Sequence, residues 1–323
     1  MVRKGSPVQI RSRAPLIRME RLEYAGEIDW GGGLRHDLFE RVLKPLPYGL
    51  GWRLRYLRGH HRWPRLSPPR TYNEKVLWRI LYDRRPELGI ASDKLASKRL
   101  VAERAPEVRI PEVYWSGTDL RELAEADLPE QWVLKPNNTS GLLHFGSGIP
   151  SPPEAAELAR STRGWIDRPF DPNVSYAWEW GYSQAERCFL VEERIGGGEE
   201  EPRVLKVMIF DGEPGILSLI TGMLGAIRVD RFAPDLSTIE FSLSRYAPSD
   251  EPATPPDATE QMIAAARRIG TLLEFVSVDF HVLADGSFSF AELTAYPSGG
   301  VLRMRPRSMD FALGERWRLP EFP

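Results

Sequence analysis

The sequence contains little cysteine and no long apolar run. Cys188 is the single cysteine among 323 residues, which excludes an intrachain disulfide and a zinc site built from several thiolates. Its apolar neighbours favour a buried strand position, and this cysteine usage is typical of a reducing compartment. The longest apolar stretch, residues 215–227, is interrupted by Ser218, Thr221 and two glycines. Because a membrane span needs roughly 18–20 apolar residues, we predict no transmembrane helix.

The remaining composition is that of a globular protein, with 42 % hydrophobic and 27 % charged residues. This balance excludes a mainly disordered or collagen-like chain. The charge is spread unevenly, because residues 1–70 carry 15 Lys and Arg against 6 Asp and Glu, whereas the rest carries 28 against 39. Residues 1–70 are therefore basic and the rest of the chain is acidic, which indicates either an anionic partner for residues 1–70 or a solvated basic face.

The first residues of the chain are unusual. Residues 1–18 contain neither the apolar core of a secretory signal nor the amphipathic period of a transit peptide. Residues 5–15 resemble the translation of a tRNA gene. We therefore expect Met19 to be the true start and residues 1–18 to be a non-native or disordered extension. Peptides from residues 2–18 in a mass spectrum of the native protein would contradict this expectation.

Helical and strand-like patterns are mixed along the rest of the chain. Residues 34–58 have helical apolar spacing that Pro45 and Pro47 interrupt. The capping-box spacing of Thr71 and Glu74 predicts a helix over 71–82. The other predicted elements are helices at 92–104, 150–165 and 260–273, and strands at 108–113, 132–134, 188–191, 204–210, 215–220, 275–283 and 287–293. Helices mixed with hairpins indicate an α+β protein.

A loop rich in glycine, asparagine and serine, residues 137–148, follows the strand-like segment that contains Lys135. Glycine lets backbone N–H groups approach phosphate oxygens, and Lys135 would add a positive charge. The loop lacks the Walker A spacing, so a plain surface loop remains an alternative. Lys94 and Lys206 also lie in structured segments, where lysines either contact a ligand or extend to solvent.

Two acids interrupt apolar strands on either side of a predicted hairpin turn. Asp279 lies in Phe-Val-Ser-Val-Asp-Phe and Glu292 in Phe-Ala-Glu-Leu-Thr, so on paired antiparallel strands they would converge on one face. Mg²⁺ is typically held by one or two carboxylates and nucleotide phosphates, and an ionised carboxylate in an apolar strand is costly unless paired or metal-bound. We favour a metal site over strand-edge acids in water. Glu192 and Glu193 suit either a hinge between lobes or a solvated loop.

Several short motifs follow one another from about residue 45 to the C-terminus. In order, they are Thr-Tyr-Asn-Glu-Lys at 71–75, Ser-Asp-Lys at 92–94, Trp-Val-Leu-Lys-Pro-Asn at 132–137, Val-Glu-Glu at 191–193, Leu-Lys-Val at 205–207, Val-Asp-Phe at 278–280, Phe-Ala-Glu-Leu-Thr at 290–294 and the segment 310–314. With this order the chain resembles the ATP-grasp superfamily and, within it, the TupA-like family named from teichuronopeptide biosynthesis.

The resemblance implies an ATP-grasp fold, in which two α+β subdomains clamp the nucleotide beside a helical N-terminal region. The expected divisions are a helical basic region at 19–90, a subdomain with the glycine-rich loop at 91–185, and a C-terminal subdomain with the metal carboxylates at 186–323. It also implies a carboxylate–amine ligase that uses ATP and Mg²⁺ and proceeds through an acylphosphate.

The matching positions receive roles from the same resemblance. Lys94 and Lys135 would contact the ATP phosphates, which the loop around Ser140 and Gly141 would cover. Glu192 and Glu193 would line the adenine hinge. Lys206 would face the γ-phosphate or the acyl substrate, and Lys206, Asp279 and Glu292 form the expected catalytic set. Asp279, Glu292 and Thr294 would hold Mg²⁺.

Two positions depart from the family pattern. Ser277 stands where relatives tend to carry an arginine, and Val204 stands where they tend to carry an aspartate. These losses would weaken catalysis unless Arg228 or Arg303 replaces the arginine and one of the glutamates at 199–201 replaces the aspartate.

The expected substrate is a small-molecule or polymeric acidic precursor of a cell-surface polysaccharide or peptide polymer. The basic residues 53–70 would suit such a substrate, or peripheral association with membrane-bound biosynthetic machinery from the cytoplasmic side. Two alternatives remain: a phosphotransferase acting on a sugar hydroxyl, and a catalytically weakened relative that binds nucleotide or glycan. Nucleic acid is not an expected partner, because the basic residues 1–70 carry no recognised nucleic-acid-binding motif.

Overall fold

The computed structural model describes residues 34–43, 45–167, 179–196, 203–222, 226–243 and 247–321. The expected extension at 1–18, the following residues up to 33 and the glutamates at 199–201 lie outside the described residues. Within the described ranges, no helix is both long and apolar enough to cross a membrane.

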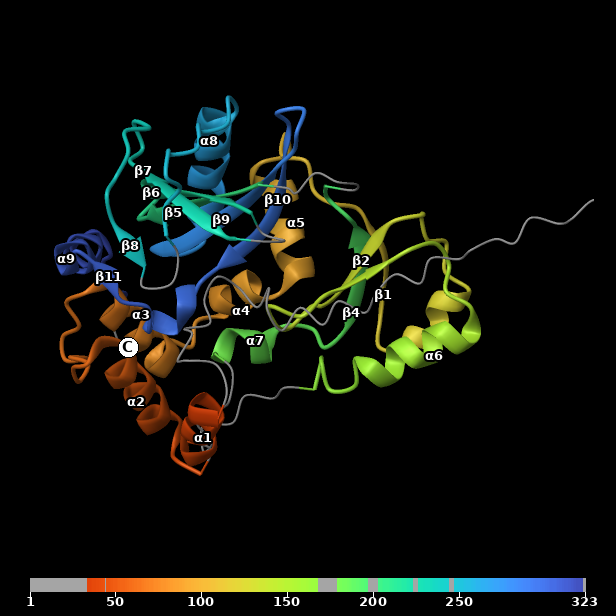
Figure 1. Ribbon diagram of the computed structural model, residues 1–323, viewed down its shortest axis with the longest axis horizontal. Coiled ribbons are helices and arrows are strands. Elements are labelled where there is room, and N and C mark those ends of the chain that lie inside the picture. The colour runs from red at the N-terminus through yellow and green to blue at the C-terminus, as the bar shows by residue number, and fades with distance from the viewer. Residues whose placement is uncertain are drawn as a thin grey trace, which may run out of the picture.

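Two antiparallel sheets form the framework of the molecule (Figure 1). The four-stranded sheet has the order β1 (Val113–Gly117), β4 (Phe189–Glu193), β2 (Trp132–Pro136) and β3 (His144–Gly146). The five-stranded sheet has the order β10 (Phe288–Thr294), β9 (Phe275–Val282), β5 (Arg203–Phe210), β6 (Glu213–Thr221) and β7 (Arg228–Phe232). A short pair joins β8 (Ser242–Leu243) to β11 (Met304–Arg305).

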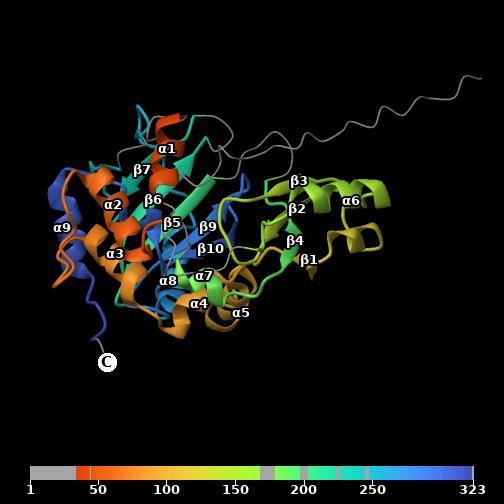
Figure 2. The ribbon, with the colours of Figure 1, turned by 90° about the horizontal axis from the view of Figure 1, so that it is seen from below.

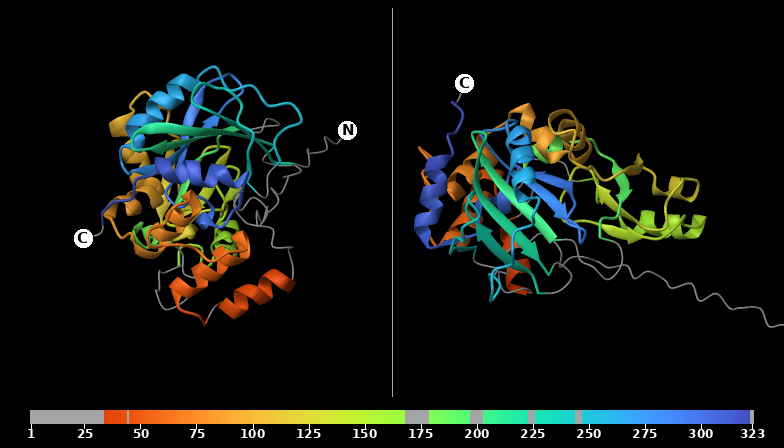
Figure 3. Two further views of the ribbon diagram at one scale, coloured as in Figure 1. Left: turned by 90° about the vertical axis from the view of Figure 1, so that its left-hand side faces the viewer. Right: turned by 90° about the horizontal axis from the view of Figure 1, so that it is seen from above.

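Helices lie beside both sheets. The helices are α1 (Leu34–Leu43), α2 (Tyr48–His60), α3 (Tyr72–Tyr82), α4 (Pro86–Ser92), α5 (Lys94–Arg104), α6 (Pro152–Ser161), α7 (Trp180–Gln184), α8 (Thr259–Gly270), α9 (Arg307–Arg316) and the 3₁₀ turns Leu120–Ala124 and Pro297–Gly300. Figure 2 shows α6 beside the four-stranded sheet at one end and α2, α3 and α9 beside the five-stranded sheet at the other. In Figure 3, α8 and α2 lie on opposite sides of the molecule.

The sequence patterns explain where several elements begin and end. Helix α3 begins at a capping box, in which the side chains of Thr71 and Glu74 each accept a hydrogen bond from the other's backbone N–H, as predicted. The side chain of Asp93 caps α5 by accepting from the N–H of Ala96 at 2.7 Å. The proline-containing break after α1 is also confirmed, because α1 ends at residue 43 and α2 begins at 48.

Two of the motifs that carry the family resemblance hold helices together. Asn73 donates to Asp310 Oδ1 from both its backbone N and its side-chain Nδ2, each at 2.9 Å. Lys75 Nζ donates to the carbonyls of Gly314, at 2.7 Å, and Trp317. These bonds attach the start of α3 to α9, far apart in sequence. The segments 71–75 and 310–314 therefore have a structural role here.

The structure differs from the sequence prediction at several elements. The strand expected at 108–113 is displaced to Val113–Gly117, and Arg109 instead forms an isolated parallel bridge with Ser289 of β10. The loop expected at 137–148 contains the short strand β3, because residues 144–146 pair with β2. Helices α4 and α7 and strand β7 were not predicted, since they are short and their periodicity is weak.

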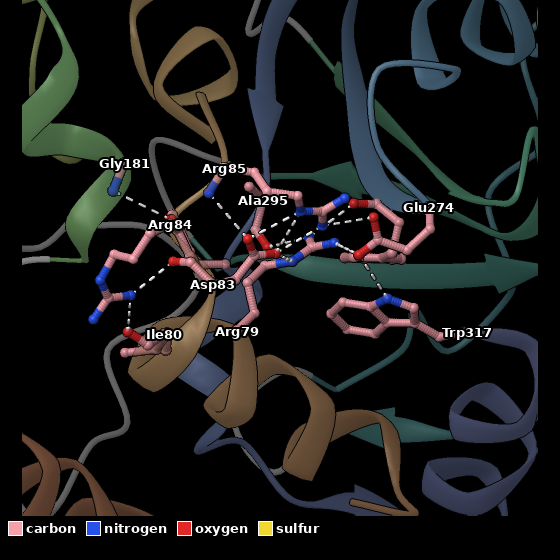
Figure 4. A network of polar contacts seen from close by, with 11 residues as sticks. Arg79, Ile80, Asp83, Arg84, Arg85, Gly181, Glu274, Ala295 and Trp317 are labelled. Atoms are coloured by element: carbon pink, nitrogen blue, oxygen red, sulfur yellow. Dashed lines mark hydrogen bonds and ion pairs between the residues drawn. The ribbon is translucent and has the colours of Figure 1, made fainter. Parts of the chain in front are cut away.

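A buried arginine connects four separate parts of the chain (Figure 4). Arg79 of α3 is fully buried and donates to the carbonyls of Phe275, at 2.8 Å, and Ala295, at 3.0 Å. It also binds the carboxylate of Glu274, which accepts from Trp317 Nε1 at 3.2 Å. Because Phe275 begins β9 and Ala295 follows β10, Arg79 holds together the ends of the two strands that carry Asp279 and Glu292.

Candidate active site

A row of polar side chains crosses the five-stranded sheet. Asp279 on β9 lies directly opposite Glu292 on β10 and, on its other side, directly opposite Lys206 on β5. Residues opposite one another in antiparallel strands project from the same face. The structure therefore brings Lys206, Asp279 and Glu292 together on one face, as the sequence predicted for the two acids.

A β-bulge places Glu292 on that face. Phe290 pairs with Phe280 and Glu292 pairs with Asp279, so Ala291 is an extra residue on β10. Without this bulge the register would align Ala291 with Asp279 and turn Glu292 to the opposite face, because side chains alternate along a strand. The bulge is thus the backbone feature that creates the carboxylate pair.

Asp279 is 1 % exposed and is held by two neighbours. The hydroxyl of Ser277 donates to Asp279 Oδ1 at 2.7 Å, and Lys206 Nζ forms an ion pair with Oδ2. Ser277 therefore supplies a hydrogen bond to the acid instead of the positive charge that the family arginine would bring. Thr294 lies opposite Ser277 on β10 and is partly exposed.

Glu292 lacks a cation of its own among the described residues. Lys206 Nζ is 3.8 Å from Glu292 Oε1, and it already pairs more closely with Asp279. Burial raises the pKa of the Glu292 carboxyl to about 8. Two adjacent carboxylates that share one lysine fit a hard divalent cation such as Mg²⁺, which prefers oxygen ligands and keeps several from water or phosphate. Within the described residues, no group of three or more His, Cys, Asp and Glu side chains forms a larger metal centre.

Lys94 lies at the first position of α5 and reaches the glycine-rich loop. Its Nζ donates to the carbonyl of Thr139, which directly precedes Ser140 and Gly141. Burial, and then the charge of Lys135, lower the pKa of Lys94 to about 7. Gly141 has a φ of 76°, a conformation that glycine adopts without strain.

The side chain of Asn137 connects α5 to the same loop. Asn137 Oδ1 accepts from the N–H of Leu95 at 2.9 Å, and its Nδ2 donates to the carbonyl of Glu186 at 3.0 Å. Asp93 accepts from the N–H of Glu186 at 2.8 Å. The Ser-Asp-Lys and Lys-Pro-Asn motifs therefore meet, and together they fix Lys94 beside residues 139–141.

Glu192 is a buried acid between two lysines. Its Oε1 lies 2.5 Å from Lys135 Nζ, and its Oε2 lies 3.0 Å from Lys98 Nζ. Burial raises the pKa of Glu192, but Lys135 and then Lys98 outweigh it, so that the pKa falls to about 2. Its neighbour Glu193 is partly exposed and pairs with Arg109.

The charges of lysines from different elements, Lys98 on α5, Lys135 on β2 and Lys206 on β5, influence the pKa of one histidine. His281 lies two residues beyond Asp279 on β9. Burial, followed by the charges that include Lys135, Lys98 and Lys206, lowers its pKa to about 3, so the ring is neutral. Lys135 and Lys206, which were predicted from separate segments of the sequence, thus both lie close enough to His281 to influence its pKa.

Sequence reasoning missed Lys98. Lys98 follows Lys94 by four residues on the same helix, and this spacing was its available signal. Arg303, one of the two arginines considered as a replacement, donates to the carbonyl of Gly59 at 3.1 and 3.2 Å. Val204 packs with Ile220 and Val229 in a small apolar cluster.

The two antiparallel sheets, one with Lys135 and the other with Lys206 and the carboxylate pair, belong to an ATP-grasp fold. A family model described as TupA-like ATPgrasp matches residues 74–318. The chain therefore belongs to the TupA-like ATP-grasp family. No curated protein matches it in sequence.

The chain is also similar to solved structures of ligases. D-alanine–D-alanine ligase from Bacillus anthracis complexed with ATP is 16 % identical, with a TM-score of 0.37, over 65 % of this chain and 55 % of that one. L-amino acid ligase from Bacillus licheniformis is 14 % identical, with a TM-score of 0.37, over 65 % and 41 %. The ATP-grasp ligase PsnB with minimal precursor, Mg and ADP is 15 % identical, with a TM-score of 0.34, over 69 % and 58 %. The chain thus spans about half the length of these proteins.

Proposed function

We propose that this protein is an ATP- and Mg²⁺-dependent ligase that joins a carboxylate to an amine. The observation that carries the proposal is the row formed by Lys206, Asp279 and Glu292 on one face of the five-stranded sheet. Lys94 and Lys135, which are close enough for the charge of Lys135 to lower the pKa of Lys94, supply further positive charge. Family membership supports the use of ATP. The carboxylate pair suits Mg²⁺, as the donor chemistry above indicates.

The reaction would proceed in two steps. An oxygen of the substrate carboxylate attacks the γ-phosphorus of ATP, which forms an acylphosphate and releases ADP. The amine nitrogen then attacks the acyl carbon, phosphate leaves, and the nitrogen loses a proton to give the amide. Neither step requires strong acid–base chemistry from the protein, because alignment and charge neutralisation lower the barrier to phosphoryl transfer.

Each residue has a proposed part in this reaction. Lys94 and Lys135 would bind the ATP phosphates beneath the loop around Ser140 and Gly141, and Glu192 and Glu193 would border the adenine. Lys206 would neutralise the transferring phosphoryl group, and Asp279 and Glu292, with Thr294 beside them, would hold Mg²⁺. Bound there, Mg²⁺ would neutralise phosphate oxygens.

We further propose an acidic precursor of a surface polysaccharide or peptide polymer as substrate. The family name and the basic residues 53–70 support this choice. Part of that basic stretch serves the fold, because Arg62 pairs with Glu74 at 2.5 Å and Arg53 donates to Tyr82. Arg65 and Arg70 are exposed and would be available to such a substrate, or to membrane-bound machinery at the cytoplasmic face.

Calorimetric titration of ATP tests the proposal. The full chain should bind ATP in a Mg²⁺-dependent manner, and Asp279→Asn and Glu292→Gln should each weaken binding by at least about tenfold, since each removes one of the two proposed carboxylate ligands of the metal. Asp285→Asn, in the exposed turn of the same hairpin, is the control and should bind as the parent does.

Product analysis then separates the alternatives. ADP release that requires both a carboxylate and an amine supports the ligase. ADP release with a sugar alone indicates the phosphotransferase, and binding without turnover indicates a catalytically weakened relative. A parent chain that does not bind ATP at all refutes the proposed function.

A further inference from the structure

The ion pairs around Glu192 contain one lysine more than charge balance requires. The Glu192 side chain is 6 % exposed and contacts two ammonium groups, those of Lys98 and Lys135. One cation is sufficient to neutralise a buried carboxylate, whereas a buried carboxylate without any cation is strongly unfavourable. One of the two lysines can therefore leave Glu192 without exposing it as an unpaired charge, provided that the other stays.

The two lysines differ in how firmly they are held. Lys98 Nζ donates to the carbonyl of Pro111 at 2.9 Å in addition to its ion pair, and its side chain is 10 % exposed. Lys135 lies on β2, its side chain is 22 % exposed, and Glu192 is the one partner of its Nζ in the part of the chain that the structure describes. Lys135 is thus the lysine that can move, and Lys98 is the lysine that remains.

We propose that Lys98 is a positioning residue, which keeps Glu192 neutralised while Lys135 turns from Glu192 to the phosphates of the bound nucleotide. This inference rests on the proposed function, since it assumes that Lys135 contacts ATP. Lys98 itself does not touch the nucleotide. Without Lys98, Lys135 becomes the single counter-ion of a buried acid, and nucleotide binding must compete with that ion pair.

A double-mutant cycle measures this exchange. ATP binding with Mg²⁺ is compared by calorimetry for the parent, Lys98→Met, Glu192→Gln and the double variant. We expect Lys98→Met to raise the Kd for ATP by at least about tenfold in the parent and by less than about threefold when Glu192 is already glutamine, because the acid that retains Lys135 is then uncharged. Lys98→Arg, which keeps the charge, should bind ATP more tightly than Lys98→Met.

Two further measurements separate positioning from a loss of structure. Thermal unfolding of each variant reports whether it folds. The double variant, in which residue 192 no longer needs a counter-ion, keeps the comparison available if Lys98→Met alone is unstable. Lys75→Met is the matched control, because Lys75 Nζ contacts the carbonyls of Gly314 and Trp317 and lies outside the site. It should leave the Kd for ATP unchanged.

The outcomes are distinct. An effect of Lys98→Met that disappears in the Glu192→Gln background supports the inference. Unchanged ATP binding in Lys98→Met overturns it, and so does an equal loss in both backgrounds, which would mean that Lys98 acts without Glu192. If the parent fails to bind ATP, the proposed function fails and the inference falls with it.

Discussion

Replacing Arg79 by methionine should destabilise the protein strongly. The substitution keeps a long unbranched side chain and removes every polar contact of a fully buried group. It leaves two carbonyls, of Phe275 and Ala295, without this donor, and it removes a close cation from Glu274. Breaking a buried ion pair from one side costs about 3–5 kcal/mol, and each buried carbonyl left unsatisfied adds about 1–3 kcal/mol.

Part of this cost is recovered by the remaining partners of Glu274. Arg85 Nη2 lies 2.8 Å from Glu274 Oε2, and Trp317 Nε1 still donates to Oε1. We therefore expect a loss of about 4 kcal/mol in the free energy of unfolding. At about 2–4 °C per kcal/mol for a domain of 150–250 residues, the melting temperature should fall by about 10 °C.

Urea unfolding followed by tryptophan fluorescence and circular dichroism measures this loss. The midpoint should move to lower urea with the slope unchanged. Arg85→Met is the matched control. Arg79 lies near two acids, Glu274 and Asp83, and Arg85 pairs with the same two, but the Arg85 side chain is 34 % exposed. The control should cost no more than about 1 kcal/mol. If Arg79→Met costs as little as Arg85→Met, the reasoning about this network is wrong.

Two further predictions concern His60 and Gly314. Burial lowers the pKa of His60 to about 4, so below pH 6.5 the unfolded chain binds more protons than the folded one, and the free energy of unfolding should fall by up to about 3 kcal/mol between pH 6.5 and 4. Urea midpoints measured across this pH range should show that loss in the parent. A loss of equal size in His60→Gln would contradict the prediction. Alanine usually stabilises a helix relative to glycine by about 1 kcal/mol, but a Cβ on Gly314 of α9 would lie 2.2 Å from the carbonyl oxygen of Arg70. Gly314→Ala should therefore lower the free energy of unfolding by about 2 kcal/mol in the same assay. A gain in stability would refute the close packing.

Much of the local structure could be predicted from residues that lie near one another in sequence. The caps at Thr71 and Asp93 need partners only three residues away, and both form. The long apolar strands β5, β6, β9 and β10 were predicted because alternation and β-branched residues are local signals. Short elements such as α7 escaped prediction, since five residues carry too little periodicity.

The candidate site was predictable in its residue types and less so in its geometry. Lys206, Asp279 and Glu292 stand out as charged residues within apolar strands, and the order of motifs indicated the family before any contact was known. The sequence showed no sign of the bulge at Ala291, which brings Glu292 opposite Asp279. It also concealed the hydrogen bond by which Ser277 holds Asp279.

The sequence by itself determined the family, the mixed α+β class and the set of chemically capable side chains, because these follow from local composition, spacing and motif order. The tertiary structure alone decided which charges pair: Lys98 with Glu192, Arg79 with Glu274, and Lys206 with Asp279. The physical reason is that such pairs join residues far apart in the sequence: Lys206 and Asp279 are separated by 73 positions, and Arg79 and Glu274 by 195. Their register depends on how separate strands and helices pack, and no local pattern records it.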